Sequence, residues 1–213
     1  MNTFRNVYWI GGSPCAGKTS ISEMLVEKYD FTLYRCDDYL DKHLKIGAKR
    51  NYPIMSKLCK MSCDEIWMRS IDIQVYEEFQ YYREEFSLIL EELEEYSVEQ
   101  TVLVEGTAVL PDAIEVLNIE KNRVVFIVPS ANFQLEHYIK RDFIPYVLEG
   151  CKNKDKAFEN WMQRDMEFAK EIARQARLNQ KTLIVTDGSN SLQENFKRVE
   201  DHFELSDRVL PKG

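Results

Sequence analysis

Short apolar runs alternate with amphipathic segments along the chain. The runs at 7–10, 31–36, 101–104, 123–128 and 182–186 have the length of buried strands, and most intervals between them carry apolar residues at helical spacing. Apolar strands separated by helical segments are typical of a parallel sheet covered on both faces. The pattern therefore predicts an α/β fold, with a five-stranded parallel sheet in a three-layer single domain over residues 1–213.

Two helical patterns are clearer than the others. The first runs from Asp64 to Tyr96, where apolar positions recur every three or four residues with glutamates between them. It predicts one long amphipathic helix whose acidic C-terminal half is a solvated face. The second begins at Ser191, whose spacing to Glu194 fits a capping box. Its predicted buried stripe consists of Leu192, Phe196, Val199 and Phe203.

A glycine-rich motif lies between the first predicted strand and the helix that follows it. The residues from Gly12 to Thr19 match G-x-x-x-x-G-K-[ST] without departure. The glycines let backbone N–H groups converge on a phosphate, Lys18 would contact the β- and γ-phosphates, and the Thr19 hydroxyl would ligate magnesium. The motif predicts ATP and Mg²⁺ as cofactors, bound by Gly12, Ser13, Pro14, Cys15, Ala16, Gly17, Lys18, Thr19 and Ser20.

Acidic residues follow the second and third predicted strands. Asp37 and Asp38 come after the second strand, at the edge of the sheet that faces the ligand crevice in open parallel folds. Asp37 is the preferred catalytic base because it follows the strand most closely, whereas Asp38 is a substrate-binding candidate. Either could instead cap the next helix. Glu105 ends the third strand and is a candidate for binding magnesium and substrate.

Basic residues are concentrated before the last predicted strand. Arg141 and Arg164 bracket a segment that contains Gly150 and several lysines, which suggests a mobile lid over about 141–164. An arginine delivered by closure would stabilise charge on a transferred phosphate, so Arg164 is a catalytic candidate and Arg141 a nucleotide-binding one. The alternative is a solvated basic loop.

The acceptor would bind in the helical insertion at about 39–97. Aromatic and basic residues of the long predicted helix suit a polar or anionic small molecule, although core packing explains the aromatics equally well. Arg69 and Tyr82 are the substrate-binding candidates in a group that also includes Trp67, Tyr81 and Arg83.

Charge, cysteine content and hydropathy limit the partners. The formal net charge of −8 repels polyanions, which disfavours a nucleic acid as substrate. No apolar run is long enough for a membrane helix, and the N-terminus lacks the pattern of a signal peptide, so we expect a cytoplasmic protein, either a monomer or a homodimer. The odd number of scattered cysteines favours reduced thiols. They are Cys15, Cys36, Cys59, Cys63 and Cys151.

These motifs resemble those of the P-loop small-molecule kinases, which include nucleoside and nucleoside-monophosphate kinases, shikimate kinase and gluconate kinase. The Cys-Asp-Asp-Tyr at Cys36–Tyr39 resembles the acidic motif of uridine-kinase-like enzymes, and Arg164-Asp165 resembles their lid Arg-Asp pair. The resemblance implies the strand order 2-3-1-4-5, an acceptor-binding region between the second and third strands, and a lid before the last strand. The chain departs from it in its long insertion and in having Glu105 where an aspartate is more usual.

The sequence thus predicts an ATP-dependent kinase acting on a small-molecule acceptor. A nucleoside or nucleotide kinase is the alternative within this class, and a non-catalytic nucleotide-binding protein is the alternative from another class. A GTPase-like switch is disfavoured because the stretch Asn153–Lys156 misses the guanine-binding motif by one position. For the same reason we expect ATP to be used in preference to GTP.

Overall fold

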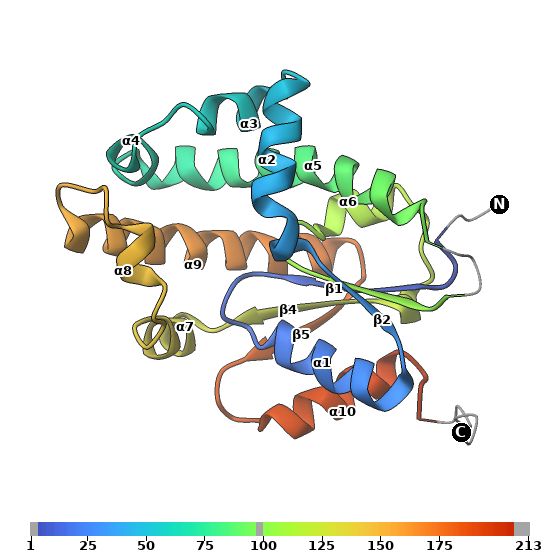
Figure 1. Ribbon diagram of the computed structural model, residues 1–213. Helices are drawn as coiled ribbons and strands as arrows, with labels where there is room; N and C mark the ends of the chain where they lie inside the picture. Colours follow the sequence, from blue (N-terminus) through green and yellow to red (C-terminus); the bar gives the residue numbers. More distant parts are fainter. Residues whose placement is uncertain (1–3, 97–99, 207–213) are drawn as a thin grey trace.

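The sheet determines where every other element lies. The computed structural model describes residues 4–96 and 100–206 (Figure 1). Its five strands are all parallel and lie in the order β2-β3-β1-β4-β5, as the sequence predicted. The strands are β1 (Val7–Gly12), β2 (Thr32–Arg35), β3 (Val102–Glu105), β4 (Val124–Pro129) and β5 (Thr182–Thr186).

Helices cover both faces of this sheet (Figure 1). Tyr8 and Ile10 of β1 pack with α1 and α10 on one face, whereas Trp9 packs with α5 and α9 on the other. This alternation follows from the two-residue period of a strand. The helices are α1 (Lys18–Tyr29), α2 (Leu40–Lys49), α3 (Pro53–Leu58), α4 (Cys63–Trp67), α5 (Ile71–Leu93), α6 (Pro111–Glu115), α7 (Ala131–Tyr138), α8 (Ile144–Val147), α9 (Lys154–Leu178) and α10 (Leu192–His202), with 3₁₀ turns η1 (Cys36–Tyr39) and η2 (Lys121–Arg123).

The single long helix predicted over 64–96 is wrong, because the chain forms α4 and α5 with a break between them. The break exposes backbone carbonyl groups that need partners. The Gln74 side chain donates to the carbonyl oxygens of Trp67 (3.2 Å) and Arg69 (2.8 Å), and Asn160 of α9 donates to Trp67 as well (2.8 Å). Tertiary hydrogen bonds therefore stabilise a break that the apolar periodicity does not reveal.

The acidic half of α5 is not simply a solvated face. Glu85 is fully buried, and its Oε1 atom lies 3.1 Å from Nδ1 of the equally buried His43 on α2. Burial raises the pKa of Glu85, against the opposing effect of His43. Thus one predicted surface glutamate attaches the insertion helix α2 to α5.

The C-terminal helix follows its prediction with one exception. The capping box of Ser191 and Glu194 is present, and Phe196, Val199 and Phe203 are buried. Leu192 is 46% exposed, because the first turn of α10 extends beyond the sheet core. None of the helices in the described part of the chain combines the length and apolar character that crossing a membrane requires.

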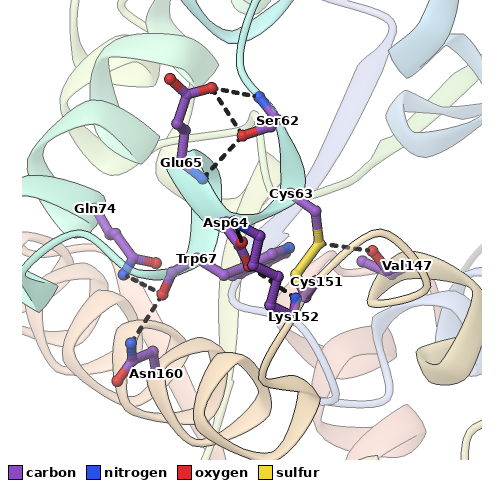
Figure 2. Close-up of a disulfide and its surroundings, with 10 residues drawn as sticks. All are labelled: Ser62, Cys63, Asp64, Glu65, Trp67, Gln74, Val147, Cys151, Lys152 and Asn160. Carbon is purple, nitrogen blue, oxygen red and sulfur yellow. Dashed lines mark hydrogen bonds and ion pairs between the residues drawn. A yellow bond between two sulfur atoms is a disulfide. The ribbon is translucent and has the colours of Figure 1, made fainter.

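The expectation of reduced thiols is wrong for two cysteines. Cys63 at the start of α4 and Cys151 before α9 form a disulfide that links segments 88 residues apart (Figure 2). The sequence could not reveal this pair, since only the fold brings α4 beside the segment that precedes α9. Cys15 and Cys36 are free and buried, and Cys59 is free and exposed. Disulfides are rare in the cytosol, so the cytoplasmic location stays a prediction.

Replacing Cys63 should destabilise the fold. A cross-link that closes so long a loop restricts the unfolded chain, so we expect Cys63→Ser to lower the free energy of unfolding by about 2–4 kcal/mol. Denaturant unfolding without reductant measures this change. Cys59→Ser, in the same insertion, is the matched control and should leave stability nearly unchanged. Thiol labelling of the unfolded, unreduced protein should modify Cys15, Cys36 and Cys59 alone; labelling of all the cysteines would contradict the disulfide.

Candidate active site

The glycine-rich loop leaves the sheet at the end of β1 through positions that demand glycine. Gly12 has φ 131°, and a Cβ atom there would lie 1.8 Å from the carbonyl oxygen of Ile127 on β4. Cys15 and Gly17 also have positive φ, at 63° and 85°. A turn that contains such conformations can point successive backbone N–H groups toward a common concavity, which favours an anion. The α1 helix begins at Lys18 and adds the positive end of its dipole.

The loop is held closed by its own lysine and by β5. The Lys18 side chain is buried, and its Nζ donates to the Ser13 carbonyl oxygen at 2.8 Å. The Thr186 hydroxyl donates to the carbonyl oxygen of Ala16 at 2.9 Å. These contacts fix the loop backbone on both sides while Lys18 still lines the cavity above it.

Thr19 and Glu105, the residues predicted to bind the metal, contact each other directly. The Thr19 hydroxyl donates to Glu105 Oε1 at 3.1 Å, and Glu105 is 3% exposed. Burial raises the pKa of Glu105, and the charge of Lys18 opposes that shift. Magnesium commonly binds one carboxylate and a hydroxyl together with phosphate oxygens and water, so this donor set fits a nucleotide-bound Mg²⁺. No cluster of three or more His, Cys, Asp or Glu residues suited to a metal occurs in the ranges 4–96 and 100–206.

One cavity of about 510 Å³ brings most of the predicted site residues together. The loop from Pro14 to Ser20 forms its floor, while Gly12 and the fully buried Ser13 lie beneath it. Asp37 and Asp38 are both exposed, but of the two only Asp37 lines this cavity. The other predicted residues that line it are Asp37, Tyr82, Glu105, Arg141 and Arg164.

Arg164 occupies the middle of α9 and not an exposed lid loop. Its guanidinium lies 2.5 Å from Glu78 and 2.6 Å from the buried Asp165, and it stacks over the Trp67 ring at 4.9 Å. Although burial opposes ionisation, the two carboxylates raise the pKa of Arg164. The lysines of the proposed lid, Lys152, Lys154 and Lys156, are exposed and do not line the cavity. Opening of the lid stays a prediction.

The segment around the disulfide includes Trp67, the ring over which Arg164 lies (Figure 2). Beside Cys63, the Asp64 carboxylate accepts the Lys152 backbone N–H at 3.0 Å. Trp67 stacks on Trp161 with ring centroids 4.7 Å apart. Accordingly the disulfide, the Asp64–Lys152 hydrogen bond and the Trp67–Trp161 stack hold α4 against α9 and the residues before it, and α9 carries Trp161 and Arg164 of the first cavity.

A second cavity, of about 240 Å³, adjoins the first. Leu40, Tyr82 and Arg164 line both, and Arg69 lines only the second. Of the other predicted acceptor residues, Tyr81 lines the second cavity, whereas Trp67 packs on Trp161. Arg83 pairs with Asp112 and lines neither cavity.

Sequence reasoning missed the carboxylates of this second cavity. Glu77 and Glu78 both line it, and each pairs with an arginine. Their spacing to Tyr81 and Tyr82 along one helix was a usable signal, since residues four apart share a helix face. It was overlooked because only aromatic and basic residues of this helix were considered as acceptor-binding candidates.

Comparisons with known proteins add a likeness in fold. No family model matches the chain, and no curated protein matches it. Shikimate kinase from Aquifex aeolicus vf5 is 18% identical, with a TM-score of 0.40 and coverage of 93% of this chain and 96% of that one. A kinase candidate from Chloroflexus aurantiacus j-10-fl is 14% identical, with a TM-score of 0.42 and coverage of 92% and 97%. Scores and identities this low carry no conclusion about activity.

Removing the Thr19 hydroxyl should make nucleotide binding less responsive to magnesium. Thr19→Val keeps the side-chain shape but loses the hydroxyl. Loss of a residue that only supports a metal ligand typically costs roughly 10–100-fold in metal affinity, so we expect the affinity for Mg²⁺-ATP to fall by at least this much. Calorimetric titration with and without Mg²⁺ measures the effect. Thr182→Val is the control, because it makes the same substitution at the first residue of β5, whereas the loop contacts the last residue, Thr186. It should leave the affinity unchanged. Equal affinity losses with and without the metal would argue against this metal pair.

Proposed function

We propose that the chain is a phosphotransferase that moves the γ-phosphate of Mg²⁺-ATP to a small-molecule acceptor. The observation that carries the proposal is the shared wall of the two cavities. The first holds the phosphate-binding loop with Asp37, Glu105 and Arg164, and the second adjoins it through Leu40, Tyr82 and Arg164. An acceptor in the second cavity would therefore present a hydroxyl to a phosphate in the first.

The loop and its magnesium pair would hold the triphosphate. The backbone amides of the loop and the Lys18 ammonium neutralise phosphate charge, after Lys18 exchanges the Ser13 carbonyl for a phosphate oxygen. Magnesium bound between Thr19, Glu105 and the phosphates would supply further neutralisation of the charge on the transferred group. The amides cost no reorganisation, because the fold holds the loop in place before ligand binds.

Asp37 would accept the proton of the attacking hydroxyl. In the transfer the acceptor oxygen forms a bond to the γ-phosphorus, the bond to the ADP oxygen breaks, and the proton passes through Asp37 to water. Asp37 lies in η1, directly after β2, and lines the first cavity. Its place between loop and insertion suits a base that must reach a hydroxyl on one side and phosphate on the other.

The two arginines would have different tasks. Arg164 is fixed by Glu78, Asp165 and the Trp67 ring, so it would hold the wall that the two cavities share, and its catalytic role stays a prediction. Arg141 is exposed and lies over the rings of Tyr138 and Phe143. It would bind phosphate from the open side of the cavity.

A non-catalytic nucleotide-binding protein is the rival from another class. Nucleotide binding alone requires the loop and the metal pair but neither Asp37 nor a second cavity. Measuring ADP release with and without a pool of small metabolites separates the two, since a kinase consumes ATP only when an acceptor is present. A nucleoside kinase is a special case of the proposed function.

Lys18→Ala should abolish transfer while leaving the fold intact. The Nζ atom bonds only within the loop and toward the cavity, so its loss removes charge stabilisation, and we expect turnover to fall by at least roughly 10²-fold. ADP release in the presence of the metabolite pool measures turnover, and circular dichroism checks the fold. Turnover near the wild-type rate in a folded variant would refute the assignment of the loop.

Asp37→Asn and Asp38→Asn form a matched pair at neighbouring positions. We expect Asp37→Asn to lower kcat by roughly 10²–10⁴-fold with ATP affinity little changed, because a base acts in the transition state. Asp38→Asn should retain turnover, since Asp38 lies outside the cavity. The reverse ranking would transfer the base to Asp38, and activity in both variants would leave the acidic pair without a catalytic task.

A further inference from the structure

The second cavity is lined by two arginines, which at first suggests an anionic acceptor. Arg69 and Arg164 reach it from opposite sides, from the α4–α5 break and from α9. Both guanidinium groups are largely withdrawn from water, with side chains 18% and 14% exposed. Their charges are available to a ligand only if no protein carboxylate already neutralises them.

Carboxylates from the same cavity neutralise both. Glu77 forms an ion pair with Arg69, and it also pairs with Lys57 of α3. Glu78 pairs with Arg164 at 2.5 Å, and Asp165 pairs with Arg164 from behind at 2.6 Å. Glu77 and Glu78 are each 11% exposed, so these are partly buried pairs and not surface contacts. The three cations and three carboxylates named here balance when all are ionised; burial raises the pKa of Glu78 to about 7, against the opposing charge of Arg164.

An acceptor with a carboxylate or phosphate would upset this balance. To reach Arg69 it would have to displace Glu77, which would keep only its pair with Lys57. To reach Arg164 it would have to displace Glu78, which would be left with little water and without its ion-pair partner. Leaving one member of a buried pair unmatched costs more than a surface contact returns. Without displacement, the anion would lie beside two carboxylates of its own sign. Both arrangements disfavour an acidic acceptor.

The remaining walls suit an uncharged molecule with hydroxyl groups. Leu40, Leu58 and Ile66 supply an apolar surface. Tyr81 and Tyr82 supply phenol groups, whose pKa values burial raises, so both stay protonated and can donate hydrogen bonds. The cavity of about 240 Å³ is also smaller than the roughly 300–1,000 Å³ typical of drug-sized ligands.

We infer that the acceptor is a small uncharged alcohol, and that the paired charges of Arg69–Glu77 and Arg164–Glu78 exclude its carboxylate and phosphate analogues. The inference rests on the proposed function and narrows it. The sequence alone was compatible with either a polar or an anionic acceptor, and the ion pairs argue against the anionic one. They also disfavour a nucleoside monophosphate as acceptor while leaving a nucleoside open.

Matched pairs of candidate acceptors test the inference. Each pair shares a skeleton and differs in an acidic group: glycerol with glycerate, sorbitol with gluconate, and nucleosides with their 5′-monophosphates. ADP release and phosphate-ester formation are measured with Mg²⁺-ATP. We expect kcat/KM to favour the uncharged member by at least about thirty-fold, the lower end of what an unmatched buried charge costs.

A charge-matched variant links the selectivity to the ion pairs. Glu77→Gln releases Arg69, so it should shift the ratio toward the acidic member of each pair. Glu91→Gln removes the same charge from α5 but breaks only the surface pair with Arg50, and it should leave the ratio unchanged. Gain of acid use in Glu77→Gln alone supports the inference.

The outcomes separate this inference from the function on which it rests. Preference for the acidic members, lost in Arg69→Met, would overturn the inference and leave the phosphotransferase intact. If the protein phosphorylates acidic probes but none of the uncharged ones, the inference is likewise overturned while the phosphotransferase function stands. A protein that binds no ATP analogue in calorimetry and forms no phosphate ester with any probe would instead refute the proposed function.

Discussion

The close approach of β1 to β4 is the constraint on which the site depends. At Gly12 the two strands leave no room for a side chain, and the positive φ there turns the chain out of the sheet. The loop amides, Lys18 and Thr19 take their positions from that turn. A second tight contact repeats the arrangement next to it, since a Cβ atom on Gly106 would lie 2.5 Å from the Cys36 side chain. These two glycines bring the ends of β1, β2 and β3 close enough for Thr19 to meet Glu105 and for Asp37 to face the loop.

Paired charges organise the other half of the molecule. The insertion and α9 meet through Arg164 with Glu78, through the Trp67–Trp161 stack and through the Cys63–Cys151 disulfide. Each contact joins a residue between 63 and 78 to one between 151 and 164. Of these side chains, Glu78 and Arg164 also line the second cavity, which is the proposed acceptor site. Stability and selectivity are coupled here, because an ion pair that holds two helices together also decides which ligand charges the cavity tolerates.

The sequence predicted the sheet well because each strand is a short apolar run with a clear end. The strand order followed from the resemblance to P-loop kinases, and the phosphate loop from a motif whose residues are contiguous. The helical insertion was harder to predict from the sequence. The α4–α5 break depends on hydrogen bonds from Gln74 and Asn160, and the disulfide on two cysteines that are distant in sequence. Glu77 and Glu78 were hidden for a similar reason, since only the fold brings Lys57 and Arg69 to Glu77 and Arg164 of α9 to Glu78.

Transfer of the γ-phosphate itself is the most direct test of the account. Phosphorus NMR of the wild-type protein with Mg²⁺-ATP and an extract of small metabolites would follow every phosphate species at once. The account predicts a new phosphate-ester signal that grows in step with ADP, with little inorganic phosphate. Persistence of intact ATP, or its conversion to ADP and inorganic phosphate alone, would contradict the claim that the two adjoining cavities form the active site of a small-molecule kinase.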